Sequence, residues 1–225
     1  MSSAAKPRAR RTRRAAKALQ VVVTAGPTRE YVDPVRYLSN ESSGKMGFAI
    51  AAAAAALGHG VTLITGPVDQ ATPEGVERVD VVSAREMLAA LREAFAGADA
   101  LFMAAAVADF RPRRKLRGKW KKKEDGTDSA VLELVKNPDL LATVAYRKGA
   151  RKVIGFALET DDGVRRAVEK LHRKNADYIV LNDASALNAG RSSVIVLGPE
   201  GEVLRLEDRP KTEVAAALVG LLDPS

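Results

Sequence analysis

Residues 36–47 combine side-chain hydrogen-bond donors with small residues, in the order Arg-Tyr-Leu-Ser-Asn-Glu-Ser-Ser-Gly-Lys-Met-Gly. An apolar run at 19–23 precedes them and an alanine-rich stretch follows, so the pattern predicts a strand, a loop and a helix start. The free N–H groups of a helix start attract anions, and serine and glycine let a ligand approach the backbone. With Arg36 and Asn40 as further donors, we interpret this loop as a site for a phosphorylated carboxylic acid. The alternative is a plain Ser/Gly loop.

Gly44 and Lys45 do not form a P-loop. That motif needs a glycine five residues before its Gly-Lys glycine and a Ser or Thr after the lysine, whereas the chain has Ser39 and Met46 there. The dinucleotide fingerprint GxGxxG is also missing after the first predicted strand. Both observations disfavour an ordinary kinase, a GTPase and an NAD enzyme.

A second candidate element is Met-Ala-Ala-Ala-Val-Ala-Asp-Phe at 103–110, which lies at the carboxyl end of a predicted strand at 100–106. Open α/β sheets bind ligands at the carboxyl ends of their strands. The small side chains of Ala104 and Ala105 leave main-chain groups accessible to a substrate. The Asp109 carboxylate is suited to coordinating a metal or hydrogen-bonding a nucleotide. The alternative is a core strand that ends in a turn aspartate.

Basic residues dominate 111–123, where nine of thirteen positions are Lys or Arg. Lys-Trp-Lys-Lys-Lys at 119–123 has Gly118 before it and Gly126 after it. A lysine flap of this kind suits a triphosphate, because several point charges can follow the phosphates as a leaving group departs. One alternative is a solvated charge run. Another is a nucleic-acid surface, although only Trp120 is available nearby to stack on a base.

Lys170 and Lys174 stand one helical turn apart in a predicted helix at 161–174. Like charges at this spacing cost about 0.2–0.5 kcal/mol, and a bound anion removes that cost. The alternative is a pair of exposed lysines. His59 and His172 have neither metal-ligand spacing nor a Ser or Cys partner in a recognisable motif, so nothing indicates a zinc site or a hydrolytic triad.

The composition of the 225-residue chain, 46% hydrophobic and 28% charged, suits one globular domain. No apolar run is long enough to cross a bilayer, and cysteine is absent, which excludes disulfides and thiolate chemistry. The net charge of +8 arises mostly at the start, because residues 1–19 hold seven Lys/Arg and no acid. We therefore expect a disordered basic tail at 1–18, a single domain at 19–225 and a cytoplasmic location. An organelle transit peptide is the alternative for the tail.

Strands and helices are expected to alternate along the chain. The expected strands are 19–24, 61–65, 77–82, 100–106, 131–135, 153–158 and 178–182, and the expected helices are 44–57, 83–95, 137–147, 161–174 and 210–222. Ser83 with Glu86 has the pattern of a capping box, and Asn137 before Pro138 is the expected N-cap of the third helix. Runs at 194–197 and 203–206 predict a hairpin. The order indicates an α/β fold, a Rossmann-like doubly wound and mostly parallel sheet with a basic flap and a C-terminal β-hairpin.

Seven motifs occur in a fixed order between residues 19 and 183. They are Val-Thr-Ala-Gly-Pro-Thr-Arg-Glu (23–30), Asp-Pro-Val-Arg-Tyr-Leu-Ser-Asn-Glu-Ser-Ser-Gly-Lys-Met-Gly (33–47), Ala-Ala-Ala-Val-Ala-Asp-Phe (104–110), Lys-Trp-Lys-Lys (119–122), Leu-Val-Lys-Asn-Pro-Asp (134–139), Gly-Phe-Ala-Leu-Glu-Thr (155–160) and Lys-Asn-Ala-Asp-Tyr-Ile-Val (174–180). Several are weak alone, but the ordered set closely resembles phosphopantothenate–cysteine ligase, the phosphopantothenoylcysteine synthetase of coenzyme A biosynthesis.

The resemblance implies a ligase that joins 4′-phosphopantothenate to L-cysteine. Bacterial members of that family use CTP and Mg²⁺ to form an acyl-cytidylate with release of pyrophosphate, and the cysteine amine then displaces CMP. This chemistry needs no enzyme nucleophile, but it needs donors for the acyl phosphate and cations for the pyrophosphate. The resemblance also implies a homodimer and a separate flavin-dependent decarboxylase, with neither a membrane nor a nucleic acid as partner.

The resemblance further assigns roles to individual residues. Asn40 matches the residue that binds phosphopantothenate and stabilises the intermediate, and Arg36 matches an arginine that in the family can reach across a dimer interface. Ala104 and Ala105 match the strand end that contacts substrate, and Lys119 matches the lysine needed for conversion of the intermediate or departure of pyrophosphate. The matched nucleotide-binding positions are Ser42, Asp109, Lys119, Asn137, Pro138, Asp139, Leu140, Phe156, Lys170 and Lys174, with Asp109 also the candidate metal ligand.

Two other functions stay open at this point. One is a Rossmann-like NAD(P)-dependent oxidoreductase, which the missing glycine fingerprint disfavours. The other is a basic nucleic-acid-binding module. Within the resemblance, Trp120 replaces the usual aliphatic residue of the lysine motif, and CTP is preferred to ATP only by similarity to the bacterial members.

Overall fold

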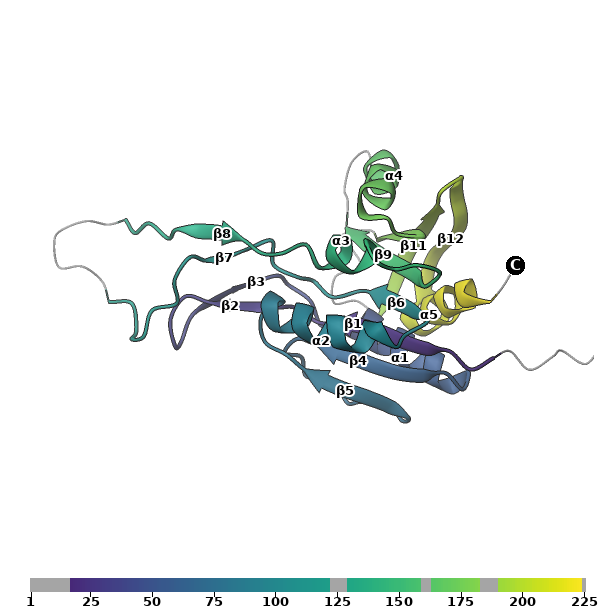
Figure 1. The fold of residues 1–225 in the computed structure, drawn as a ribbon, viewed down its shortest axis with the longest axis horizontal. Helices are drawn as coiled ribbons and strands as arrows, with labels where there is room; N and C mark the ends of the chain where they lie inside the picture. Colours follow the sequence, from purple (N-terminus) through teal and green to yellow (C-terminus); the bar gives the residue numbers. More distant parts are fainter. Residues whose placement is uncertain (1–16, 122–128, 159–162, 183–189, 224–225) are drawn as a thin grey trace, which may run out of the picture.

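A single eight-stranded sheet forms the centre of the protein (Figure 1). The computed structural model describes residues 17–121, 129–158, 163–182 and 190–223, so most of the predicted tail lies outside the described residues. The strand order is β12-β11-β10-β9-β6-β1-β4-β5. The strands are β1 (Gln20–Ala25), β4 (Gly60–Thr65), β5 (Val76–Asp80), β6 (Ala100–Met103), β9 (Lys152–Leu158), β10 (Tyr178–Asn182), β11 (Arg191–Gly198) and β12 (Gly201–Pro210).

The strands from β5 to β10 are parallel, and β11 and β12 add an antiparallel hairpin at one edge. This arrangement confirms the predicted α/β fold and its C-terminal hairpin, whose strands are longer than predicted. After β5 the chain crosses back past β1 to form β6, so the sheet has a switch point between β1 and β6. Ligands of open α/β sheets bind at the carboxyl ends of the strands near such a point.

Helices cover both faces of the sheet, which explains why β1 is apolar and almost fully buried. One face packs against α1 (Lys45–Ala56), α5 (Lys211–Val219) and the 3₁₀ turn Gly220–Leu222. The other packs against α2 (Ala84–Ala96), α3 (Leu140–Ala145) and α4 (Gly163–Lys174). Small residues let α1 approach β1 closely, since a Cβ at Gly47 would lie 2.6 Å from the Ala25 Cβ. None of the described helices is long and apolar enough to span a membrane.

The two predicted helix caps have opposite outcomes. Ser83 and Glu86 form the expected capping box of α2, because the Ser83 hydroxyl accepts from the Glu86 N–H and the Glu86 carboxylate accepts from the Ser83 N–H. The predicted cap Asn137 is wrong. Asp139 caps α3 instead, accepting a hydrogen bond of 2.9 Å from the Ala142 N–H. Aspartate is as good an N-cap as asparagine, and the Asn137 side chain is bound elsewhere.

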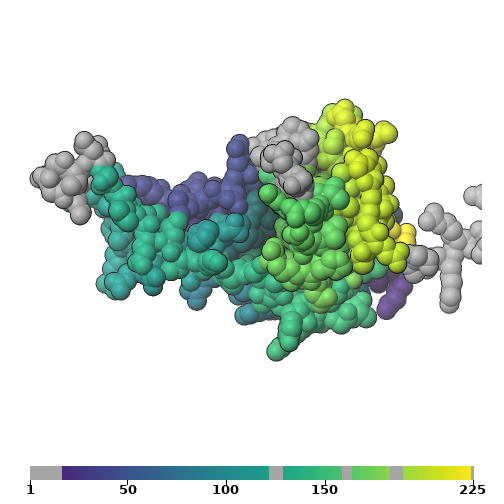
Figure 2. Space-filling model, turned by 90° about the horizontal axis from the view of Figure 1, so that it is seen from above, coloured from purple at the N-terminus to yellow at the C-terminus, as the bar shows by residue number. Residues whose placement is uncertain are grey.

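An extended arm projects from the carboxyl edge of the sheet (Figures 1 and 2). It comprises residues 29–39 and the described residues between 110 and 136, which include two short antiparallel pairs, β2 (Arg29–Tyr31) with β3 (Tyr37–Ser39), and β7 (Phe110–Pro112) with β8 (Leu134–Lys136). The arm is anchored to the body by the buried Glu30, whose carboxylate accepts a hydrogen bond of 2.9 Å from the Ala84 N–H at the start of α2. Of these four strands the sequence predicted only one, at 131–135, and the structure places it later, as β8 at Leu134–Lys136. Strands of three residues carry almost no periodic signal.

Candidate active site

A pocket of about 490 Å³ lies at the carboxyl ends of β6 and β9, between α3, α4 and the base of the arm. Many of the predicted substrate and nucleotide positions line it. They are Ala105, Asp109, Asn137, Pro138, Asp139, Leu140, Phe156, Lys170 and Lys174. These residues come from four separate stretches of the chain, so the fold brings together side chains that the sequence separates by up to 69 positions.

The loop after β6 forms one wall of the pocket, and two buried threonines hold it. Strand β6 ends at Met103 rather than at the predicted Ala106. The backbone N–H groups of the next residues donate instead to Thr24 and Gly26, at the end of β1 and just after it. The Ala105 N–H donates to the Thr24 hydroxyl at 3.2 Å, and the Ala108 N–H donates to the Thr28 hydroxyl at 3.0 Å. The exposed carboxylate of Asp109 is thereby placed at the pocket wall.

Asn137 joins this loop to the end of β8. Its side-chain amide donates to the Ala108 carbonyl at 2.8 Å, and its own N–H donates to the Asp109 carbonyl at 2.8 Å. Its side-chain oxygen accepts from Arg111 at 3.2 Å. Asn137 therefore fixes the wall of the pocket, in addition to the ligand contact that the resemblance assigns to it.

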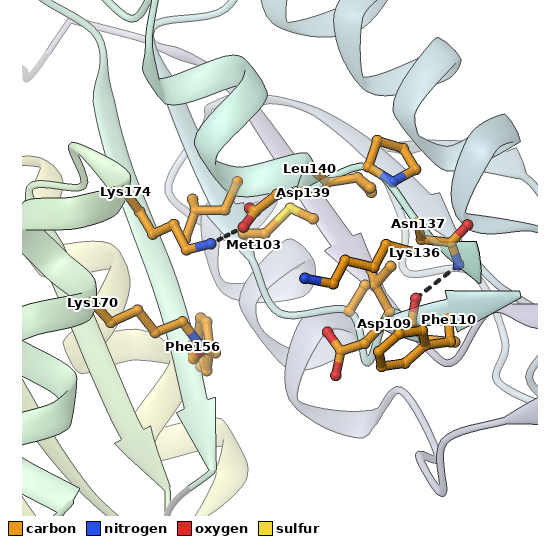
Figure 3. A pocket seen from close by; sticks show the side chains of 15 residues that line it. Met103, Asp109, Phe110, Lys136, Asn137, Asp139, Leu140, Phe156, Lys170 and Lys174 are labelled. Atoms are coloured by element: carbon orange, nitrogen blue, oxygen red, sulfur yellow. Dashed lines mark hydrogen bonds and ion pairs between the residues drawn. The ribbon is translucent and has the colours of Figure 1, made fainter. Parts of the chain in front are cut away.

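Three lysines and two aspartates face one another across the pocket (Figure 3). Lys174 forms an ion pair with Asp139, which also caps α3, and Lys170 donates to the Phe156 carbonyl at 2.7 Å. Burial lowers the pKa of Lys174, while the nearby Asp109 charge opposes this shift. An anion bound beside Lys174 would favour the charged ammonium and raise that pKa again.

The third lysine, Lys136, points into the centre of the pocket (Figure 3) and received no role from the sequence. The sequence signal that could have identified it is its position directly before Asn137 in the motif at 134–139. Its side chain could not be assigned a direction without the β7–β8 pairing, which aligns Lys136 with Phe110.

Three other predicted residues, Asn40, Ala104 and Ser42, do not line the pocket. The Asn40 side chain donates to the carbonyl of Val107, a lining residue, at 3.0 Å, which places Asn40 at the rim. Ala104 directly precedes Ala105. Ser42 accepts from the Gly44 N–H at 3.3 Å, just before α1. Gly44, with φ of 74°, would place a Cβ 3.3 Å from the Gly26 nitrogen, so the helix start lies close to the turn after β1.

Arg36 and Lys119 belong to the arm. Arg36 follows the turn between β2 and β3, and its guanidinium donates to the Trp120 carbonyl at 2.5 Å. Lys119 is exposed and lies outside the pocket. The predicted flap continues into residues 122–128, which lie outside the described part of the chain.

Residues 16–223 match the family described as DNA/pantothenate metabolism flavoprotein C-terminal domain. The chain belongs to this family. It is 45% identical over 195 residues to the coenzyme A biosynthesis bifunctional protein CoaBC of Vibrio parahaemolyticus, covering 84% of this chain and 49% of that protein. It is 49% identical over 178 residues to the same protein of Escherichia coli K12, covering 79% and 44% respectively. The chain thus spans about half the length of these curated relatives.

A solved structure from the same family confirms the fold. The crystal structure of the C-terminal domain of coenzyme A biosynthesis bifunctional protein CoaBC has a TM-score of 0.79 and 38% identity, and the match covers 92% of this chain and 95% of that one. The match therefore includes almost the whole of that solved domain. The resemblance read from the seven motifs is confirmed at the level of the family.

The pocket residues fit a magnesium ion only if the nucleotide phosphates supply part of the coordination shell of the ion. Among the described residues no three metal-ligating side chains gather at one point. In the pocket, Asp139 is engaged by Lys174, which leaves Asp109 as the carboxylate available to a cation. Magnesium commonly binds through one or two carboxylates together with substrate phosphates and water, and Asp109 meets that requirement.

Proposed function

We propose that the protein is a phosphopantothenate–cysteine ligase, which joins 4′-phosphopantothenate to L-cysteine at the expense of CTP. The observation that carries this proposal is the gathering of the predicted nucleotide positions around one lysine-lined pocket, in a chain that matches almost the whole C-terminal domain of a coenzyme A biosynthesis protein. Membership of a family alone would support a fold, and the arrangement of these residues supports the chemistry.

The proposed reaction has two steps. First, the carboxylate oxygen of phosphopantothenate bonds to the α-phosphorus of CTP as the bond from that phosphorus to the bridging oxygen breaks, which releases pyrophosphate. Then the cysteine amine bonds to the acyl carbon, the bond from that carbon to the CMP oxygen breaks, and the amine loses a proton to solvent. Neither step needs an enzyme nucleophile, so binding and charge stabilisation account for the catalysis.

The side chains of the pocket have matching tasks in this proposal. Lys136, Lys170 and Lys174 offset the charge of the triphosphate, and the small side chain of Ala105 leaves room at the pocket wall for the substrate. Asn40 at the rim binds the acid and its activated form, and Arg36 and Lys119 act from the arm. Asp109 would hold Mg²⁺, which supplies charge neutralisation to the phosphates when it is bound.

The proposal is tested by measuring pyrophosphate release from the purified chain with Mg²⁺ and phosphopantothenate. CTP and ATP are compared, each with and without cysteine. We expect release with CTP that depends on phosphopantothenate, and formation of the conjugate only when cysteine is present. Release with ATP alone would retain the ligase and overturn the choice of CTP. No release with either nucleotide from folded protein would contradict the proposed function.

The pocket lysine missed by the sequence provides a specific prediction. Lys136→Met should raise the KM for CTP about tenfold, equivalent to about 1.4 kcal/mol, because one cation facing the triphosphate is lost. The KM for phosphopantothenate should stay within about twofold. Lys152→Met, at the amino end of β9 and far from the pocket, is the matched control. An unchanged KM for CTP in the Lys136 variant would place this lysine outside the nucleotide site.

We further propose that the ligase is a homodimer whose subunits meet through the arm. The arm exposes large apolar side chains, including Val35 (62% exposed) and Leu116 (41%), as dimer interfaces commonly do before assembly. Val35→Glu should convert the dimer to a monomer in size-exclusion chromatography with light scattering. Leu57→Glu, at an equally exposed position (63%) after α1, should leave the dimer intact. A Val35 variant that stays dimeric would exclude this surface as the dimer interface.

The proposal also includes a cytoplasmic location for the ligase and a separate flavin-dependent decarboxylase that acts on its product.

A further inference from the structure

Asp33, in the turn between β2 and β3, holds together two parts of the chain that are 87 residues apart. Its side chain has no exposed surface. One carboxylate oxygen accepts hydrogen bonds of 2.8 Å from the N–H groups of Val35 and Arg36. The other accepts from the Trp120 N–H at 3.0 Å and lies 3.3 Å from the Arg36 guanidinium. The hydrogen bond from Trp120, with those of the turn and the Arg36 charge, lowers the pKa of Asp33 although burial opposes the shift.

Arg36 also binds the backbone of Trp120. Its guanidinium donates to the Trp120 carbonyl at 2.5 Å, so the Asp33–Arg36 ion pair binds both backbone polar groups of that residue. Residues 115 and 116, which precede Trp120, also contact the region of this turn. The Leu116 N–H donates to the Val32 carbonyl at 2.8 Å, and the Lys115 ammonium lies 4.8 Å from the centre of the Tyr31 ring. Lys119 is covalently adjacent to the residue held in this way.

The second oxygen of Asp33 is not needed by the turn. An aspartate or an asparagine can form such a turn through one side-chain oxygen. A buried carboxylate is costly unless several donors satisfy it, and here the additional donors come from Trp120 and Arg36. The charged side chain therefore serves the contact with the 115–120 segment as well as the local turn.

The same turn also leads to Asn40. Strand β3 connects Arg36 to Asn40 through three residues, and Ser39 donates to the Thr28 carbonyl at 2.8 Å. The Asn40 side chain in turn donates to Val107 at the pocket. Arg36 and Asn40 are thus connected through β3, and Asp33 links this part of the chain to Trp120, the residue after Lys119.

We propose that Asp33 is a positioning residue, which holds the Lys119 segment in register with Arg36 and Asn40 for the reaction. This inference rests on the proposed ligase function. It assigns to Asp33 a task in the rate of the reaction rather than in nucleotide binding, because the pocket lysines lie on β8 and α4, apart from the turn.

The test uses the full chain and its single tryptophan, Trp120. Asp33→Asn keeps an oxygen for the two turn hydrogen bonds and replaces the acceptor that faces the Trp120 N–H. Fluorescence emission and acrylamide quenching should then report a more exposed indole. In the pyrophosphate assay, kcat should fall roughly 10- to 100-fold because a displaced catalytic group loses its alignment, while the KM for CTP should stay within about twofold. Asp99→Asn is the matched control, since Asp99 accepts a backbone N–H from Gln20 at the opposite edge of the sheet.

Asp33→Ser provides a second variant, because a serine hydroxyl can support the turn but is too short to bind Trp120. Circular dichroism and thermal melting establish that each variant is folded. Unchanged Trp120 fluorescence in both folded variants, or a changed fluorescence with unchanged kcat, would overturn the proposal. Absence of pyrophosphate release from the unaltered protein would instead contradict the ligase function, and the fluorescence comparison would still decide whether Asp33 holds the segment.

Discussion

Replacing Lys119 by Gln is expected to lower kcat for pyrophosphate release roughly 100- to 1000-fold, the range typical of losing a group that stabilises developing charge. The leaving pyrophosphate carries several negative charges, and an ammonium that approaches it stabilises the transition state more than the bound substrates. Glutamine keeps the length and a donor group but removes the charge. The KM for CTP should change little, because Lys119 lies outside the pocket that the three other lysines line.

The control for this variant is Lys121→Gln, an exposed lysine two residues further along the same segment. Its kcat should remain within about threefold of the unaltered protein. Size-exclusion chromatography should give the same mass for both variants, since neither change removes an apolar contact of the arm. Equal rates for the Lys119 variant and the unaltered protein would return this segment to an ordinary solvated charge run.

Replacing Asn40 by Asp should impair capture of the activated acid about 100-fold while leaving the fold intact. The amide now donates to the Val107 carbonyl at the pocket rim, and a carboxylate cannot make that bond. The substitution also places a negative charge beside an anionic acyl phosphate, so the repulsion should be largest when the intermediate forms. Quench-flow measurement of the acyl-nucleotide and of the final conjugate separates this defect from one in nucleotide binding.

Asn175→Asp offers the matching control for the Asn40 variant. The Asn175 side chain also donates to a backbone carbonyl, that of Ala145, at 2.8 Å, but it lies at the end of α4. Comparable activity of the Asn175 variant and the unaltered protein would tie the Asn40 effect to its place at the rim. Normal turnover by the Asn40 variant would remove Asn40 from the reaction.

Local sequence patterns predicted the parts of the fold that depend on neighbouring residues. The apolar run of β1 and the Ser83–Glu86 capping box were correct because strand burial and helix capping act within a few positions. The prediction of Asn137 as the cap of α3 was wrong, because Asp139, two positions later, is an equally good capping residue. The Asn137 side chain does not cap the helix because it donates to the carbonyl of Ala108, 29 positions away.

Contacts between distant segments explain the other differences. The β2–β3 and β7–β8 pairs have three residues on each strand, so only the pairing itself identifies them. Lys136 became a pocket residue through the β7–β8 register, and Asp33 became the partner of Trp120 through the folding of the arm. Neither relation has a spacing rule in the sequence.

The sequence by itself determined the family and the α/β class, and it supplied the chemical groups of the candidate site, because ordered motifs and hydrophobic periodicity are properties of the chain. Only the tertiary structure decided which of these groups share a pocket. It placed Lys136, Lys170 and Lys174 together, put Asn40 at the rim, and left Lys119 on the arm beside the Asp33–Arg36 pair. The physical reason is that a site forms from side chains on different strands and helices, whose relative positions are set by packing and long-range hydrogen bonds.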